Sequence, residues 1–251
     1  MKAPNSTING HTAVDLEHVT RAYRRDEFEV RALDDVTLQI PSRSFVAIMG
    51  PSGSGKTTML NLIAGIDHPT SGRVAVGGEE IAGMPESELA SWRARHIGLV
   101  FQFYNLIPVL TAFENVELPL LLTDLSKSVR MEHVEFALRA VGLSDRMTHY
   151  PRQLSGGQEQ RVAIARAIVT DPTIVVADEP TGDLDAKSAD EILNLLSQLN
   201  EQLQKTIVMV THDSRSERFV ETVYRLEKGL LVGTEKGGAA PKPDAKIRVQ
   251  V

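Results

Sequence analysis

Two patterns of apolar and polar residues indicate two kinds of β-strand in this chain. From Ala13 to Ile40 the two kinds of residue alternate in patches, which predicts antiparallel strands with a turn around Arg24–Glu27. The stretch GRVAVGGEEI (72–81) predicts a strand, a turn and a second strand. Four other runs are almost continuously apolar, as strands buried on both faces are: 44–50, 97–102, 173–178 and 206–212.

Segments with apolar residues at helical spacing lie between these strands. They cover 59–66, 86–96, 131–143, 158–170 and 186–203. Alternation of buried strands with helices predicts an α/β fold with a parallel-sheet core, to which the N-terminal strands add an antiparallel β subdomain. In 103–150 a loop-like stretch leads directly into a helix, so we expect an inserted α-helical subdomain at about 103–160.

Composition limits the functions open to the chain. Its 251 residues are 42% hydrophobic, which is enough for one large core, so we expect a single domain at 13–233 between flexible tails at 1–12 and 234–251. The net charge of −6 argues against a dedicated nucleic-acid surface. The sequence has no cysteine, no signal-peptide pattern and no apolar run near the ~20 residues of a membrane span. We expect a soluble, cytoplasmic protein that meets a membrane only through a partner.

The stretch GPSGSGKTT matches the phosphate-binding pattern G-x-x-x-x-G-K-[ST]. A predicted strand precedes it and a predicted helix follows it, as this loop requires, although an ordinary glycine-rich turn would share its glycines. We expect Lys56 to reach the β- and γ-phosphates of a nucleotide and the Thr57 hydroxyl to bind Mg²⁺. The loop residues are Gly50, Pro51, Ser52, Gly53, Ser54, Gly55, Lys56, Thr57 and Thr58.

Polar residues also stand where other buried strands are predicted to end. Asp178 ends TIVVAD, where a carboxylate can hold Mg²⁺, and Glu179 after it can polarise an attacking water. His212 follows TIVMVT, and Gln102 ends IGLVFQ. Each residue has an ordinary alternative, a solvated loop acid or a structural histidine. Tyr23 could stack on a base or be a half-buried strand tyrosine.

The pentapeptide LSGGQ (154–158) directly precedes a predicted helix. It leaves backbone N–H groups at the positive end of that helix, which makes a second anion site. Because a predicted helical block separates it from the phosphate loop, a rigid monomer would struggle to bring both sites onto one nucleotide. Two copies arranged head-to-tail in a closed twofold dimer solve this, since each supplies its LSGGQ to the nucleotide of the other.

Together these motifs resemble the nucleotide-binding subunit of ABC transporters, over residues 13–233. The resemblance implies a P-loop NTPase core that binds ATP and Mg²⁺ and hydrolyses ATP to ADP and phosphate. It makes GPSGSGKTT the Walker A loop, Asp178 the Walker B aspartate and Mg²⁺ ligand, and Glu179 the catalytic glutamate. Gln102 becomes the Q-loop glutamine, a further Mg²⁺ ligand, and His212 becomes the switch histidine at the γ-phosphate.

The same resemblance implies roles for the remaining candidate residues. Tyr23 would stack on adenine, and the D-loop TGDLD (181–185), which includes Asp185, would lie across the dimer interface. Asp183 departs from the family pattern, where a small residue or Asn is commoner, which puts the fine adjustment of that interface in question. The signature residues that would meet the nucleotide of the second copy are Ser155, Gly156, Gly157 and Gln158.

Within this family the chain is most similar to ATPases of lipoprotein-release and macrolide-export systems. The implied partner is an integral membrane permease of the FtsX/macrolide-exporter type, which would hold the ATPase on the cytoplasmic face of the inner membrane. An uptake system, a force-transmitting cell-division complex and a non-transport ABC ATPase are the alternatives. Five residues after Gln102 would line a groove for a permease helix or only pack the helical subdomain: Phe103, Tyr104, Leu106, Ile107 and Pro108.

Overall fold

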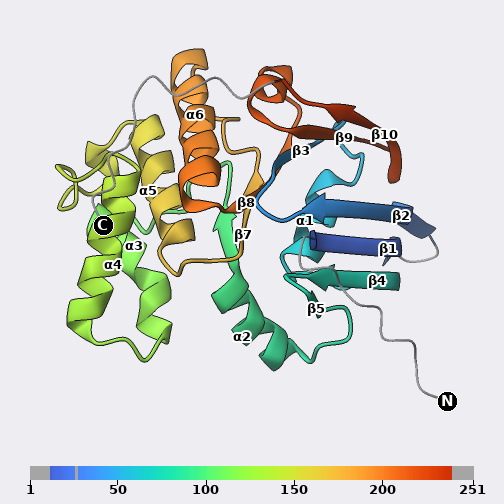
Figure 1. The fold of residues 1–251 in the computed structure, drawn as a ribbon, viewed down its shortest axis with the longest axis horizontal. Coiled ribbons are helices and arrows are strands. Elements are labelled where there is room, and N and C mark those ends of the chain that lie inside the picture. The colour runs from blue at the N-terminus through green and yellow to red at the C-terminus, as the bar shows by residue number, and fades with distance from the viewer. Residues whose placement is uncertain (1–11, 26–27, 239–251) are drawn as a thin grey trace.

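The computed structural model describes residues 12–25 and 28–238, which contain two β-sheets and the helices packed on them (Figure 1). The N-terminal sheet is antiparallel and has the strand order β2-β1-β4-β5. Its strands are β1 (Thr12–Arg25), β2 (Phe28–Pro41), β4 (Ser71–Val76) and β5 (Glu79–Glu80). The predicted strands are therefore present, while Asp26 and Glu27 at the predicted turn lie outside the described residues.

The second sheet has six strands in the order β10-β9-β3-β8-β7-β6. All neighbours are parallel except the final hairpin, in which β10 runs antiparallel to β9. Its strands are β3 (Phe45–Met49), β6 (Ile97–Val100), β7 (Ile174–Asp178), β8 (Thr206–Thr211), β9 (Thr222–Glu227) and β10 (Leu230–Lys236). The four predicted buried strands are adjacent in this sheet, which confirms the predicted α/β fold with a parallel core.

Helices cover both faces of the parallel sheet. The α-helices are α1 (Lys56–Ile63), α2 (Glu86–His96), α3 (Ala112–Glu117), α4 (Lys127–Ala140), α5 (Gly156–Ile168) and α6 (Ala186–Leu203). Short 3₁₀ helices follow at η1 (Leu118–Leu122), η2 (Pro151–Gln153) and η3 (Ser214–Phe219). Figure 1 shows α3, α4, α5 and α6 gathered on the left and the antiparallel sheet on the right.

The pleat of the parallel strands divides their side chains between two hydrophobic cores. In β3, Val46 and Ile48 belong to the core shared with α1, α2 and the antiparallel sheet. Phe45, Ala47 and Met49 belong to the core shared with α3, α4, α5 and α6. Successive strand residues point to opposite faces of a sheet, so each continuous apolar run serves both cores. The helix α1 therefore lies on one face of the sheet and α5 on the other.

The C-terminal boundary of the predicted domain is wrong. No strand was expected after 212, but β9 and β10 form a hairpin, and Thr234, Glu235 and Lys236 of the predicted tail pair with β9. The Gly237 N–H then donates to the Glu221 carbonyl at 2.9 Å. The ordered chain thus continues beyond residue 233, where the domain was expected to end. Of the predicted tails, residues 1–11 and 239–251 lie outside the described residues, and Thr12 belongs to β1.

Within the described part of the chain, no helix is both long enough and apolar enough to cross a membrane.

Candidate functional site

The polar motifs meet along one edge of the parallel sheet. Because β3, β8, β7 and β6 are neighbours and parallel, the segments after their carboxyl ends lie side by side. The phosphate loop follows β3, His212 follows β8, Asp178 ends β7, and Gln102 comes shortly after β6. Open α/β sheets bind ligands at this edge. The topology therefore brings together four motifs that span more than half of the sequence.

The phosphate loop has a shape that only glycine can take at two positions. Gly55 has a φ of +102°, and a Cβ built on it would lie 2.2 Å from the Ala32 carbonyl oxygen. A Cβ on Gly50 would lie 2.0 Å from the Leu226 carbonyl oxygen. Carbonyls of β2 and β9 thus press the loop from outside, and no side chain fits between them. This close packing fixes the loop ahead of α1.

Lys56 opens α1 and folds back over the loop. Its Nζ atom donates to the Gly50 carbonyl at 2.9 Å and to the Pro51 carbonyl at 3.0 Å, and the residue is buried. The ammonium group is therefore held at the centre of the loop. Next to it, the hydroxyl of Thr57 stands close enough to the Asp178 carboxyl group to lower its pKa. A cationic centre and an oxygen cluster thus stand together at the start of α1.

Asp178 supplies the carboxylate of that cluster. Burial and the neighbouring charge of Glu179 raise the pKa of Asp178, while Lys56 and the Thr57 hydroxyl act in the opposite direction. Its Oδ1 atom is buried without a hydrogen-bond partner among the described residues. A desolvated carboxylate oxygen beside a hydroxyl suits a hard cation such as Mg²⁺, which takes one or two carboxylates and completes its shell with water and phosphate. The residues present therefore fit Mg²⁺.

Glu179 and His212 form a pair beside the Mg²⁺ candidates. His212 Nδ1 lies 2.8 Å from Glu179 Oε1, and since an ionised carboxylate can only accept, the imidazole donates. Glu179 has a φ of +46°, a strained value that the bond from its N–H to the Val210 carbonyl helps to hold. The Glu179 side chain is 17% exposed and that of His212 71% exposed. The pair lines a cavity of about 370 Å³.

Gln102 faces the segment after Glu179. A Cβ built on Gly182 would lie 3.0 Å from Gln102 Nε2, so the amide packs directly on the glycine of TGDLD. Asp185, at the end of the same segment, caps α6 by accepting from the N–H groups of Lys187 and Ser188. The Ser188 N–H and hydroxyl, together with the Lys187 N–H, lower the pKa of Asp185. Asp185 thus has a structural role at the start of α6, while its role at a dimer interface stays a prediction.

The signature LSGGQ begins α5 with a reciprocal cap. Ser155 N–H donates to Gln158 Oε1 at 2.9 Å, and the Gln158 N–H donates to Ser155 Oγ at 3.4 Å. A Cβ on Gly156 would lie 2.8 Å from the Tyr104 hydroxyl, and one on Gly157 would contact Ser188. The helix α5, which the signature begins, packs on the face of the sheet opposite α1 (Figure 1).

Tyr23 lies on β1, a strand of the antiparallel sheet. Its side chain is 41% exposed, and its hydroxyl donates to Asp67 Oδ2 at 2.7 Å. Asp67 follows α1, the helix that Lys56 opens. Tyr23 is therefore linked to the segment that leaves the phosphate-loop helix, and an exposed part of its ring remains open to a ligand.

Comparison with known proteins decides between the possible NTPase families. The family described as ABC transporter matches the chain over residues 33–182, which is more than half of its length. The chain belongs to the ABC transporter family. This ABC ATPase domain is 42% identical to the ABC transporter ATP-binding protein YtrE of Bacillus subtilis, over 88% of the chain and 97% of that protein.

Two further comparisons place the domain among its relatives. It is 42% identical to the macrolide export ATP-binding/permease protein MacB of Hyphomonas neptunium, over 92% of the chain but only 36% of that longer protein. The solved dimer of the ATP-binding cassette MJ0796, bound to ADP and Pi, has a TM-score of 0.80 and 45% identity, covering 89% of this chain and 98% of that one. The domain is accordingly an ATP-binding domain and an ATPase of this family.

Sequence reasoning missed the polar anchors of the ABC domain's helical layer. Gln160 on α5 is fully buried and donates to the carbonyls of Phe101 at 3.2 Å and Pro180 at 2.7 Å. Arg166, also on α5, donates to the carbonyls of Tyr104 at 2.8 Å and Asn105 at 2.7 Å. The signature helix therefore holds the segment after β6 and the residue after Glu179. No local pattern marks these contacts.

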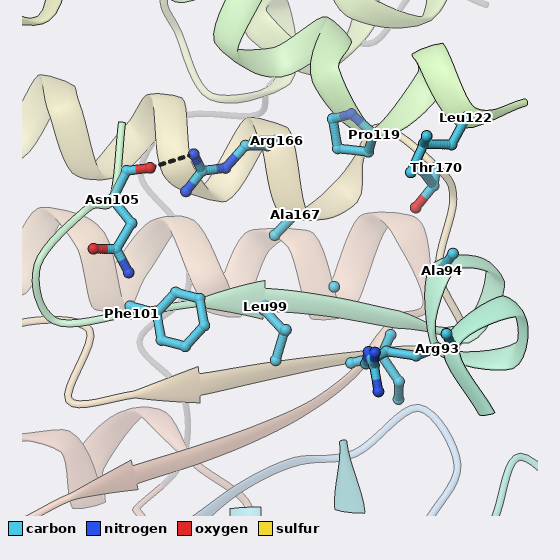
Figure 2. A pocket seen from close by; sticks show the side chains of 13 residues that line it. Arg93, Ala94, Leu99, Phe101, Asn105, Pro119, Leu122, Arg166, Ala167 and Thr170 are labelled. Atoms are coloured by element: carbon cyan, nitrogen blue, oxygen red, sulfur yellow. Dashed lines mark hydrogen bonds between the residues drawn. The ribbon is translucent and has the colours of Figure 1, made fainter. Parts of the chain in front are cut away.

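A cavity of about 590 Å³ opens between α2, β6, η1 and α5 (Figure 2). Figure 2 shows Leu99 and Phe101 on one side, Pro119 and Leu122 opposite them, and Arg166 bound to the Asn105 carbonyl. Four of the five residues expected to form a docking groove line a second, smaller cavity of about 250 Å³: Phe103, Tyr104, Leu106 and Pro108. Their docking role stays a prediction. Asn105 contributes to both cavities, and Ile107 is 40% exposed.

Proposed function

We propose that the chain powers a membrane permease by ATP-driven, head-to-tail dimerisation. The observation that carries this proposal is that α1, the helix after the phosphate loop, and α5, the helix that LSGGQ begins, lie on opposite faces of the parallel sheet. Each half-site then needs a second copy to complete it. The solved structure of a relative that is 45% identical, described as a dimer bound to ADP and Pi, supports a homodimer. In the dimer, Ser155 and Gly156 of each copy meet the γ-phosphate in the other.

Each residue of the site has a place in this dimer. The loop 50–58 binds the ATP phosphates through its N–H groups, and Lys56 moves from its loop carbonyls to the β- and γ-phosphates. Thr57, Gln102 and Asp178 hold Mg²⁺, which when bound neutralises charge on the phosphate oxygens. Tyr23 stacks on the adenine ring. Gln158 and Asp185 cap the helices that frame the interface.

Hydrolysis follows from the Glu179–His212 pair. Glu179 accepts a proton from the water that attacks the γ-phosphorus, and the bond between that phosphorus and the β–γ bridging oxygen breaks. His212, which shares a hydrogen bond with Glu179, stabilises charge at the γ-phosphate and holds the carboxylate in place. Loss of the γ-phosphate removes the ligand that both copies share. The dimer then reopens, and the binding energy of ATP has been converted into motion.

The permease docks at the cavity shown in Figure 2 and on the adjacent surface around Phe103. Both include Asn105 of the segment after Gln102, so reopening at the nucleotide reaches the docking surface through this segment. The likeness to MacB supports an exporter or lipoprotein-extracting system with a permease of the FtsX/macrolide-exporter type, on the cytoplasmic face of a membrane. A solved structure of CbiO1 of Clostridium perfringens, described as part of the ABC transporter complex CbiONQ, is also similar, at 27% identity and a TM-score of 0.83. An uptake system is the second candidate.

Glu179→Gln tests the enzymatic part of this proposal. The variant keeps the shape of the side chain but loses the base, so turnover should fall about 10²–10⁴-fold while ATP binding remains. Size-exclusion chromatography should then show a dimer with ATP and Mg²⁺ and a monomer without them. Glu201→Gln, at an exposed position of α6, is the matched control and should behave as the wild type. An ATP-bound variant that remains monomeric would contradict the dimer.

Ser155→Arg tests whether the signature acts in the other copy. The long cationic side chain blocks the interface, so turnover should be lost while a single chain still binds ATP with wild-type affinity. Loss of ATP binding by the isolated chain would instead assign LSGGQ to the nucleotide of its own chain.

A further inference from the structure

Two neighbouring side chains of β1, Arg21 and Tyr23, contact the side chain of Asp67 from a distant part of the sequence. The Tyr23 hydroxyl donates to Asp67 Oδ2 at 2.7 Å. Arg21, two residues earlier on β1, donates from Nε to the same oxygen at 2.9 Å and pairs with Oδ1 at 2.7 Å. The His68 N–H also donates to Oδ1, at 2.8 Å, so each carboxylate oxygen of Asp67 is engaged by two donors. Such bidentate contacts fix the orientation of both partners.

Arg21 also covers one face of the Tyr23 ring. Its guanidinium carbon lies 4.5 Å from the ring centroid, in the geometry of a cation–π contact. The side chains of Arg21 and Asp67 are only 23% and 20% exposed, whereas Tyr23 is 41% exposed. A flat ligand can therefore stack only on the ring face that Arg21 leaves free. The cation on the covered face also makes the ring poorer in electrons, which strengthens stacking with an electron-rich purine.

The segment that carries Asp67 ties this cluster to the phosphate-loop helix. The N–H groups of Ile66 and Asp67 donate to the Asn61 carbonyl in α1 at 2.8 Å and 3.2 Å. Further along, the Thr70 N–H donates to the Thr20 carbonyl of β1 at 2.8 Å, and the Ala22 N–H donates back to Thr70 Oγ1 at 3.0 Å. One end of the segment is thus bonded to α1 and the other end to β1.

The charge on Asp67 is maintained by its partners. Burial raises the pKa of Asp67, but the Tyr23 hydroxyl, the His68 N–H and Arg21 together bring the pKa below its usual value. Burial likewise lowers the pKa of Arg21, but its contacts with Tyr23 and Asp67 bring that pKa above its usual value. At neutral pH the carboxylate is therefore ionised and accepts every bond described above, so the ring has one preferred position.

We propose that Asp67 and Arg21 are positioning residues for the nucleobase, which hold the Tyr23 ring at a fixed place relative to α1 and the phosphate loop. The inference rests on the proposed stacking of Tyr23 on adenine. It adds that the base end and the phosphate end of the site are joined through Asp67. Nucleotides with a base then gain affinity from this connection, whereas a bare chain of phosphates gains none.

The test compares binding of ATP with binding of inorganic tripolyphosphate, both with Mg²⁺, by calorimetry on the full chain. Asp67→Ala and Arg21→Met should raise the Kd for ATP about three- to tenfold and leave the Kd for tripolyphosphate within about twofold of wild type. At saturating ATP, kcat should be unchanged, because the phosphate end remains intact. Asp145→Asn, an exposed carboxylate paired with Arg146, is the control and should change neither ligand.

Tyr23→Phe covers the case in which the Asp67 variant does not fold. It retains the ring and loses only the bond to Asp67, so the Kd for ATP should rise about two- to fivefold. Tyr23→Ala should raise it further, and adding Asp67→Ala to Tyr23→Ala should have no additional effect, since Asp67 acts through the ring.

Two different results would overturn the inference. An equal loss for ATP and tripolyphosphate would mean that Asp67 only supports the fold. A wild-type Kd for ATP in Asp67→Ala and Tyr23→Phe, with a raised Kd in Tyr23→Ala, would mean that the ring stacks without help. If Tyr23→Ala itself binds ATP normally, the proposed stacking is wrong, and the positioning role falls with it.

Discussion

Replacement of Asn115 by leucine should detach the loop that precedes α3. Asn115 is fully buried, and its Oδ1 atom accepts from the Ile107 N–H at 2.8 Å. Its amide nitrogen donates to the carbonyls of Ile107, Leu110 and Thr111 at 3.0 to 3.1 Å. Leucine branches at the same carbon, with two methyl groups in place of the amide oxygen and nitrogen, and makes none of these bonds. The substitution therefore tests polar anchoring without creating a cavity.

The structure sets the size of the effect. The Ile107 carbonyl also accepts from Leu110 N–H, and the Thr111 carbonyl from Asn115 N–H, so each keeps a backbone partner. The Ile107 N–H and the Leu110 carbonyl lose the bond described above, at a cost of about 1–3 kcal/mol each when buried. Because Ile107 is 40% exposed, water partly replaces its bond. We expect a total loss of about 3 kcal/mol, or about 6–12 °C in Tm for a domain of this size.

Urea and thermal unfolding monitored by circular dichroism measure this loss. Asn194→Leu is the matched control, because the Asn194 amide makes a single bond within α6, to the Asp190 carbonyl at 2.9 Å, and should change stability by less than about 1 kcal/mol. ATP affinity should stay at the wild-type value, since α1, the helix after the phosphate loop, packs on the opposite face of the sheet from α3. An Asn115→Leu variant within about 0.5 kcal/mol of wild type would refute the anchoring role.

Three more substitutions test other parts of the molecule. Gly55→Ala should abolish ATP binding and lower Tm, because the new Cβ would lie 2.2 Å from the Ala32 carbonyl oxygen at a φ of +102°. Gly83→Ala is the control and should have no effect in the same assays, because a Cβ there has no atom within 4 Å. Arg166→Lys should lose about 1–2 kcal/mol in urea unfolding, because one ammonium cannot reproduce the bidentate grip on two loop carbonyls. In Asp67→Asn, urea unfolding at pH 7 and pH 3 should show a stability deficit that shrinks toward acid. The folded-state pKa of Asp67 is lowered, so its contribution is complete above the unfolded pKa of about 3.9 and disappears as the pH falls through the folded value; a deficit that grows toward acid would contradict this sign.

The sequence pattern predicted the strands β3, β6, β7 and β8 but neither strand of the final hairpin, β9 or β10. Continuous apolar runs mark strands buried on both faces, but β10 is largely exposed and has no such run. The turn before it, Lys228–Gly229, has a positive φ at both positions, +48° and +82°. Asn-Gly or Asp-Gly would signal such a turn, whereas a lysine in the first position conceals it. The strand β9 is held in the sheet because it buries Val223 in one core and Leu226 in the other. The strand β10 then pairs with β9.

The candidate site likewise has some parts that short motifs predict and others that depend on contacts between distant residues. Phosphate loop, Asp178–Glu179 and LSGGQ are each set by a few consecutive residues, so their positions follow from short motifs. The contacts of Gln160 and the Arg21–Asp67 pair join residues 20 to 59 positions apart. Only the folded topology brings these residues together, and a single sequence carries no pattern for them.

The polar hairpin edge has a consequence for how copies of the chain associate. A sheet edge with free N–H and C=O groups can pair with any other exposed strand, and this is a common start of aggregation. The outer strand β10 carries Thr234, Glu235 and Lys236 at its exposed end, and charged side chains disfavour such pairing. In the proposed cycle two copies join and separate, so their contacts must be reversible. Charged side chains on the edge strand β10 disfavour irreversible strand pairing between copies.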